Sequence, residues 1–168
     1  GESFHNNYQN TLDYISGLAK KDIRWAQYNM GVIYEEGRGV PTDMKVALTW
    51  YTKAATNGHN KAQFRIGKLH QDAHFGKPNF KVAAKWYKKA AEQNHISANT
   101  HLAYLYANGQ GVDRSDRLAL KHYRKAAIQG DVEAQSELGY WYKTGRQVDE
   151  NPLQSIYWLE LAAKNGDL

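Results

Sequence analysis

The sequence contains no cysteine among its 168 residues, and this absence removes several classes of site at once. Disulfide bonds, thiolate metal ligands and a cysteine nucleophile are all excluded. Reducing and oxidising compartments both remain open. No apolar run approaches the roughly 20 residues that a membrane-spanning helix needs, so we expect no membrane insertion.

Recognisable catalytic motifs are also lacking. The chain has no G-x-S-x-G elbow, no phosphate-binding loop, no serine–lysine motif and no G-x-G-x-x-G after a strand. His70 and His74 have a spacing that can hold a metal on one helical face, but no H-E-x-x-H arrangement accompanies them. We therefore expect no enzymatic activity, no bound metal and no cofactor.

The dominant positive feature is an internal repeat of 36 residues. A shift of that length brings residues of the same type into register over four units without an insertion, which is typical of a repeat protein. The aligned columns are Ala26, Ala62, Ala98 and Ala134; Met30, Ile66, Leu102 and Leu138; Tyr34, His70, Tyr106 and Tyr142; Trp50, Trp86, His122 and Trp158; and Tyr51, Tyr87, Tyr123 and Leu159.

Within each unit the apolar residues have helical spacing. Ala26, Met30 and Ile33 form the stripe of a first helix, helix A, and a wider stripe around Trp50 and Tyr51 marks a second, helix B. Each unit is thus helix A, a loop of about six residues, helix B and a tight turn. Helix B is expected to begin after the N-caps Asp43, Asn79, Ser115 and Asn151 and to end before Gly58, Asn94, Gly130 and Gly166.

A glycine column lies inside helix A, where glycine costs about 1 kcal/mol relative to alanine. Its members are Gly31, Gly67, Ala103 and Gly139. We expect the small residue to allow close approach of a bulky ring from the Trp or Tyr column of helix B. One helical pair cannot cover both apolar stripes, so neighbouring units must stack.

These residues resemble the Sel1-like repeat, a relative of the tetratricopeptide repeat. The best match runs from Ala26 to Gly58 and includes the Gly37–Val40 turn. The resemblance implies an all-α fold, a right-handed α/α superhelix of about four helix-turn-helix repeats plus a partial N-terminal unit. The second repeat departs from the pattern in the loop at 73–79, and the resemblance does not predict the conformation of this loop.

We expect one domain over residues 1–168, with a partial unit at 9–21 and repeats at about 22–58, 59–94, 95–130 and 131–166. Gly166, Asp167 and Leu168 match the residues that lead into another helix A after the third repeat. The chain is therefore interpreted as part of a longer array.

The face of helix A opposite its apolar stripe is the candidate binding surface. The resemblance implies that stacked A helices line a concave groove that binds protein, and at 8–10 Å per helix four of them would span roughly 40 Å, or about ten extended residues. Packing of Tyr28 and Phe64 between A helices is the alternative at those two positions. The candidate binding residues are Trp25, Tyr28, Val32, Glu35, Lys61, Phe64, Lys68, Gln71, Thr100, Tyr104, Asn108, Ser136, Tyr140 and Lys143.

The sequence thus favours a non-catalytic scaffold that binds a partner peptide or protein on the concave face. The alternative is an envelope module that binds peptidoglycan or another glycan through exposed aromatics. Family resemblance implies bacterial roles in signalling, the cell envelope or host interaction, and a periplasmic or secreted location, with a cytoplasmic one also open. The net charge of +5 has no single basic run, so nucleic acid is not expected as a partner, and we expect a monomer in isolation.

Overall fold

The chain folds as a succession of α-helices joined by short turns. A computed structural model describes the backbone of residues 2–166 and the side chains of residues 8–166. Gly1, Asp167 and Leu168 lie outside the described residues, and with them the start of the expected further helix A. The helices within the described range are α1 (Glu2–Lys20), α2 (Arg24–Glu36), α3 (Met44–Thr56), α4 (Asn60–Gln71), α5 (Phe80–Glu92), α6 (Ile96–Asn108), α7 (Asp116–Ile128), α8 (Val132–Thr144) and α9 (Pro152–Gly166).

This order confirms the alternation of A and B helices. Helices α2, α4, α6 and α8 are the A helices of the four repeats, and α3, α5, α7 and α9 are the B helices. The partial unit expected at 9–21 is the C-terminal part of α1, which begins earlier, at Glu2. No helix in the described part of the chain has both the length and the apolar character to cross a bilayer.

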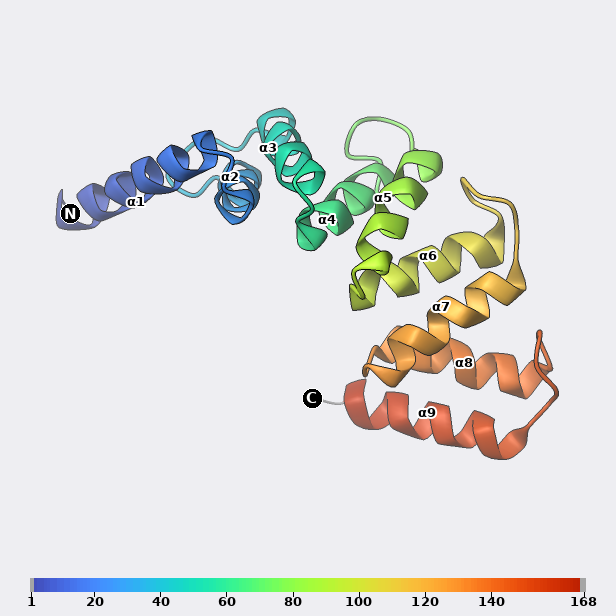
Figure 1. Cartoon of the computed structure of the whole chain (residues 1–168). Coiled ribbons are helices and arrows are strands. Elements are labelled where there is room, and N and C mark those ends of the chain that lie inside the picture. Colours follow the sequence, from blue (N-terminus) through green and yellow to red (C-terminus); the bar gives the residue numbers. More distant parts are fainter. Residues whose placement is uncertain (1, 167–168) are drawn as a thin grey trace. The chain divides into compact units, whose positions relative to one another are not determined.

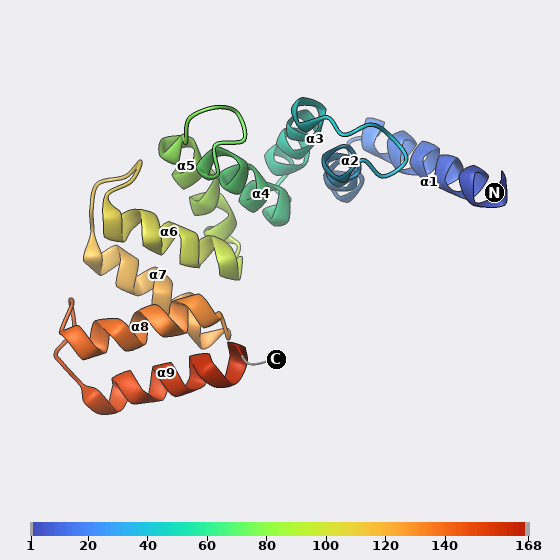
Figure 2. The same cartoon turned by 180° about the vertical axis from the view of Figure 1, so that it is seen from behind.

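Two compact units divide the chain, residues 1–68 and residues 69–168, and each is described by itself. In unit 1, α1 packs on α2 and α2 on α3. In unit 2, α5, α6, α7, α8 and α9 each pack on the next, and α8 and α9 lie side by side in both views (Figures 1 and 2). The expected single domain over residues 1–168 stays a prediction.

The predicted N-caps of the B helices are confirmed. The carboxylate of Asp43 accepts hydrogen bonds from the backbone N–H groups of Lys45 and Val46. The same role belongs to the side chains of Asn79, Ser115 and Asn151 in the other repeats. A polar side chain at this column satisfies helix N–H groups that have no partner within the helix.

The predicted stops are confirmed for three repeats and wrong for the fourth. Gly58, Asn94 and Gly130 have positive φ angles of 82°, 59° and 94°. Asp22, one period before Gly58, has the same left-handed conformation. Gly166 instead remains helical as the last residue of α9, and its φ is not in the left-handed region.

The glycine column does allow close approach of helix B. A Cβ on Gly31 would overlap the ring of Tyr51, which is fully buried. On Gly139 it would lie 2.6 Å from Cγ of Leu159, the residue that occupies the tyrosine column in the last repeat. The expectation of a bulky ring is confirmed at Gly31 and is wrong at Gly139, whose partner from the tyrosine column is the aliphatic Leu159.

A column of buried amides ties three of the A helices, α2, α4 and α8, to the helix before them, and the sequence reasoning missed it. Gln27, Gln63 and Gln135 donate from Nε2 to the carbonyl oxygens of Ala19, Ala55 and Ala127 at 3.4, 3.1 and 3.0 Å. Those carbonyls lie near helix C-termini, where they lack partners within the helix. Buried donors and acceptors thus satisfy each other at each of these junctions.

Candidate partner-binding surface

The predicted binding residues of unit 2 form an exposed strip on the A helices α6 and α8. Tyr104 and Tyr140 are 41% and 56% exposed, although both rings are large and apolar. Asn108, Ser136 and Lys143 are also exposed. These five residues are called the unit 2 strip. They lie away from the buried stripe of their helices, as the period predicts.

The backbone beneath the strip is held in place at the ends of α6 and α8. The Asn108 amide donates to the Tyr104 carbonyl at 2.9 Å, and the Thr144 hydroxyl donates to the Tyr140 carbonyl at 3.0 Å. Gly109 and Gly145 then end the two helices in the left-handed conformation. Both tyrosines therefore project from ordered helices, so ordering the backbone costs little on binding.

Thr100 corrects the prediction for unit 2. It is 1% exposed, and its Oγ1 makes no hydrogen bond within the described structure. The reason is that α6 packs against both α5 and α7, which bury a wide arc of its surface, and a short side chain does not reach beyond them. Thr100 is therefore not part of the strip.

Glu35 and Gln71 are engaged within the chain rather than open to a ligand. The Tyr51 hydroxyl donates to Glu35 at 2.5 Å, and Arg65 Nε donates to the same carboxylate at 2.9 Å. In the next repeat the Tyr87 hydroxyl donates to Gln71 Oε1 at 2.6 Å. Burial, and next the neighbouring Tyr28 ring, raises the pKa of Tyr51, so its hydroxyl stays a donor. Both positions close the hairpin instead of facing a partner.

The corresponding residues of unit 1 are more enclosed. The ring of Tyr28 stacks on that of His59 with centroids 4.6 Å apart, and it is tilted against Tyr51 at 5.6 Å. Tyr28 is therefore partly used in packing, against α3 and against the residue that caps α4. Trp25 is 44% exposed. Lys61 is exposed, and Val32, Phe64 and Lys68 are half-buried.

The caps of the A helices are a further feature that sequence reasoning missed. Nδ1 of His59 accepts from the N–H of Ala62 at 3.2 Å, and Nδ1 of His95 accepts from the N–H of Ala98 at 3.3 Å. Asp131 caps α8 in the same column. The signal was available, because these residues are spaced by the same 36-residue period. Burial, and then Arg24 and Lys61, lowers the pKa of His59, which favours the neutral form that can accept this bond.

The histidines of the second repeat have structural positions. His70 is half-buried and its ring lies 5.7 Å from that of Phe75, while burial lowers its pKa. His74 is exposed at the end of the hairpin. Within the described residues, no three histidine, aspartate or glutamate side chains come together to hold a metal ion.

The stacked pairs of helices and their repeated caps define a protein of the α-solenoid class, built from two-helix repeats. The family model of the Sel1 repeat matches residues 26–59, 60–95, 96–131 and 132–167, so the chain belongs to the Sel1 repeat family. Proteins of this family are in general interaction scaffolds without catalytic activity, and they are often periplasmic or secreted.

Solved structures agree with this assignment. The chain is similar to a protective antigen present in uropathogenic Escherichia coli strains that displays an SLR fold, with a TM-score of 0.87 and 30% identity over 98% of this chain. The chain spans 37% of that protein's length. A Sel1 repeat protein from Oxalobacter formigenes gives a TM-score of 0.83 and 31% identity over 99% of this chain and 71% of its own. Cysteine rich protein B from Helicobacter pylori, at 17% identity and a TM-score of 0.59 over 77% of this chain and 93% of its own, shares the fold. The comparison with curated proteins finds no match.

Proposed function

We propose that the chain is a non-catalytic scaffold that binds a peptide or protein segment on the face of its A helices that lies opposite their apolar stripe. The observation that carries this proposal is the exposure of Tyr104 and Tyr140, 41% and 56%, in one column of two A helices. Tyrosines exposed on a rigid backbone provide apolar area and a hydroxyl at a low cost in conformational entropy. Aromatic anchors of this kind dominate the energetics of protein interfaces.

The surface of unit 1 is the second part of the proposal. Trp25, Tyr28, Val32, Lys61, Phe64 and Lys68 remain candidates there. Trp25 is the most accessible aromatic anchor in this set, because Tyr28 already stacks on His59. We therefore expect Trp25 to contribute more to binding than Tyr28.

A pair of matched variants tests the role of the unit 2 strip. Replacing both Tyr104 and Tyr140 with alanine should abolish capture of the partner, because loss of two anchors costs about 2 kcal/mol or more each. Tyr157→Ala is the control, since Tyr157 is 55% exposed but lies on the B helix α9. A photo-crosslinker at position 108 should identify the captured protein. Equal capture by the double variant and the wild type would exclude the strip as the docking site.

The same experiment separates protein binding from glycan binding. Exposed tyrosines also suit stacking on sugars, which is the alternative function. Soluble muropeptides should leave the crosslink at position 108 unchanged if the natural partner is a protein. Competition by muropeptides, with loss of muropeptide binding in the double variant, would favour the glycan alternative instead.

Location and assembly are part of the proposal. Family membership supports a periplasmic or secreted location, which fractionation of cells that produce the protein from its own gene would test. We propose that the isolated chain is a monomer, and light scattering during size-exclusion chromatography measures this directly.

A further inference from the structure

Two B helices of unit 2, α5 and α7, carry more cations than the B helix of unit 1. Helices α5 and α7 place four cations each in the same repeat columns, and all eight are exposed. The corresponding columns of α3 hold two lysines and two threonines, and those of α9 hold no cation. The eight residues, called the cationic surface, are Lys81, Lys85, Lys88, Lys89, Arg117, Lys121, Arg124 and Lys125.

Few acids balance these charges. On α5 the acid is Glu92 at the last residue, and on α7 it is Asp116. Asp116 is already bound by Arg146, at 2.6 Å from Nη2 to Oδ1 and 3.0 Å from Nε to Oδ2. Within the described residues, no member of the cationic surface forms an ion pair. The surface therefore has capacity for an anionic ligand.

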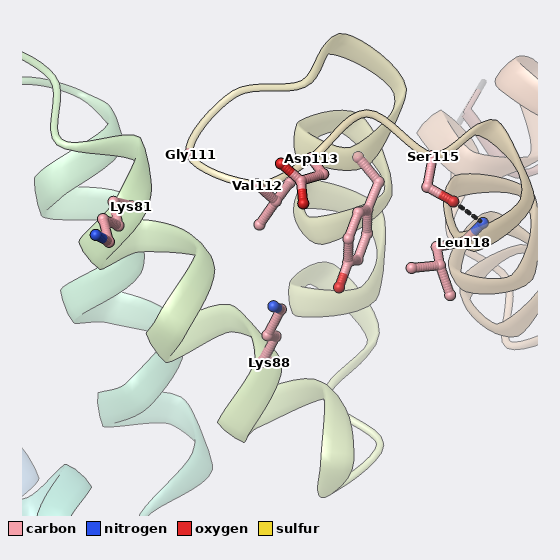
Figure 3. A pocket seen from close by; sticks show the side chains of 8 residues that line it. Lys81, Lys88, Gly111, Val112, Asp113, Ser115 and Leu118 are labelled. Atoms are coloured by element: carbon pink, nitrogen blue, oxygen red, sulfur yellow. Dashed lines mark hydrogen bonds between the residues drawn. The ribbon is translucent and has the colours of Figure 1, made fainter.

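An open pocket of about 700 Å³ lies at the edge of this surface. Figure 3 shows Lys81 and Lys88 on α5 at one side and the loop with Asp113 and Ser115 at the other. Tyr106, Gly111, Val112 and Leu118 complete the lining. The Ser115 oxygen accepts the cap bond from Leu118 N–H at 3.2 Å, so its hydroxyl proton can still be donated.

Close packing fixes the loop against α5. A Cβ on Gly111 would overlap the backbone of Phe80 and lie 2.5 Å from the nitrogen of Lys81. Gly111 itself has a φ of 69°, in the left-handed region. Glycine at 111 therefore lets the loop touch the start of α5, and this contact holds Asp113 opposite the two lysines.

The lining combines two ammonium groups with groups that bind hydroxyls. The ammonium groups suit a carboxylate, whereas the Asp113 carboxylate suits a hydroxyl donor and repels a second anion. An acidic sugar presents both kinds of group on one ring. We propose that this pocket and the adjoining cationic surface bind an oligosaccharide that carries carboxylate groups, at a site separate from the unit 2 strip.

Nucleic acid fits the same surface less well. Single strands bind through aromatic rings on which bases stack. Lys89 lies over the ring of Trp86 at 5.6 Å, and Tyr106 is covered by His122 at 5.9 Å and by Lys88 at 5.5 Å. The Tyr106 ring that lines the pocket and the Trp86 ring on the same cationic helix α5 are thus already in contact with other side chains, and Asp113 would repel a phosphate.

Calorimetric titration of the whole chain with hexagalacturonate tests the proposal. Lys81→Gln combined with Lys88→Gln should weaken binding about tenfold or more, because two charge-assisted contacts are lost. The matched control is Lys45→Gln with Lys53→Gln on α3, which removes the same charge and should change the affinity less than about twofold. Circular dichroism establishes that both variants fold.

Asp113→Asn distinguishes a sugar site from general attraction of anions. This variant should strengthen binding of polyglutamate, which only feels the charge, clearly more than binding of hexagalacturonate, whose hydroxyls lose one of the two acceptor oxygens of the carboxylate. Three results would overturn the proposal: no binding of hexagalacturonate at millimolar concentration, equal losses in the two lysine pairs, or equally tight binding of polyglutamate or single-stranded DNA. None of these results bears on Tyr104 and Tyr140, so the proposed function is tested independently.

Discussion

The hairpin of the first repeat, in unit 1, and that of the third repeat, in unit 2, close with different polar contacts on the same apolar framework. In unit 1 the end of α2 is joined to α3 and α4 through Glu35, which accepts from Tyr51 and Arg65. In unit 2 the equivalent position on α6 is Ala107, which has no side-chain acceptor. There Arg146 binds the Ala107 carbonyl at 3.1 Å and Asp116 at 2.6 Å. The apolar columns thus specify the fold, and the polar closure is interchangeable between repeats.

The glycine column gives the largest expected difference between the units. Gly31→Ala should lower the free energy of unfolding by about 2–3 kcal/mol, because the added methyl overlaps the buried ring of Tyr51. Gly139→Ala should cost less, about 1 kcal/mol, since the facing Leu159 side chain is 41% exposed and can shift and alanine favours the helix, while the backbone nitrogen of Leu159 would lie 3.3 Å from the added Cβ. Urea denaturation followed by tryptophan fluorescence measures both. Equal losses would show that the last repeat is packed as tightly as the first.

Substitution of the bridging arginines should give a smaller difference in stability, and here the greater loss is expected in unit 2 rather than in unit 1. Arg146→Lys should cost about 2 kcal/mol, because lysine cannot reproduce the two bonds to Asp116 together with the bond to the Ala107 carbonyl. Arg65→Lys should cost about 1 kcal/mol or less, as Glu35 keeps the bond from Tyr51. The hydrogen bond from Arg146 holds the pKa of Asp116 below its usual range. Titration of Asp116 by NMR should therefore move upward in Arg146→Lys, and an unchanged titration would argue against this coupling.

A third comparison concerns His122, which stands in the tryptophan column of repeat three. Burial, and then Lys125, Lys121 and Lys88, lowers the pKa of His122 from 6.5 to about 4. Between those pH values the unfolded chain binds more protons than the folded one. The contribution of His122 to the free energy of unfolding is therefore complete above about pH 6.5 and is lost as the pH falls toward 4. We expect a loss of about 1–2 kcal/mol after solvent screening.

The matched variant for this pH effect is His122→Trp, which restores the residue found at Trp50 in unit 1. Its unfolding free energy should depend less on pH between 6.5 and 4 than that of the wild type. Parallel pH profiles for the two proteins would assign the acid sensitivity to other groups, with the capping His59 of unit 1 as the next candidate.

Residues that recur in every repeat were predictable, and residues that act once were not. The period alone predicted the caps at Asp43 and Asn79 and the approach of Tyr51 to Gly31, because each repeat samples the same local geometry. The bond between Arg146 and Asp116 spans 30 residues in columns of mixed composition, so no periodic signal marks it. Such pairs form because two residues lie close together in the folded chain, and this closeness cannot be predicted from the types of the two residues.

The candidate site shows the same limit. Helical spacing predicted exposure correctly for Tyr104 and Tyr140 but not for Thr100. A helical wheel gives the direction of a side chain, but it does not tell how much of the helix surface the neighbouring helices bury. Glu35 failed for another reason: its direction was outward, but a buried tyrosine hydroxyl on the next helix required an acceptor.

The smallest expected effect concerns the loop of repeat two, which the sequence left undetermined. Ala73 has a φ of 61° where Gly37, Gly109 and Gly145 have 71°, 65° and 67°, so an alanine adopts the glycine conformation. The hydrogen bonds from His74 N–H to Leu69 and from Asn79 N–H to His70 match those of the other repeats. These flanking bonds hold Ala73 in the strained region.

Ala73→Gly should therefore raise the free energy of unfolding by about 0.5–1 kcal/mol, the strain of about 1–2 kcal/mol being partly offset by the greater freedom of glycine in the unfolded chain. Gly109→Ala is the reciprocal control in the same unit and should destabilise by at least that amount, since its added Cβ would also lie 3.2 Å from Cβ of Arg114. If Ala73→Gly left the urea midpoint unchanged while Gly109→Ala lowered it, steric contact rather than backbone conformation would account for glycine in this column.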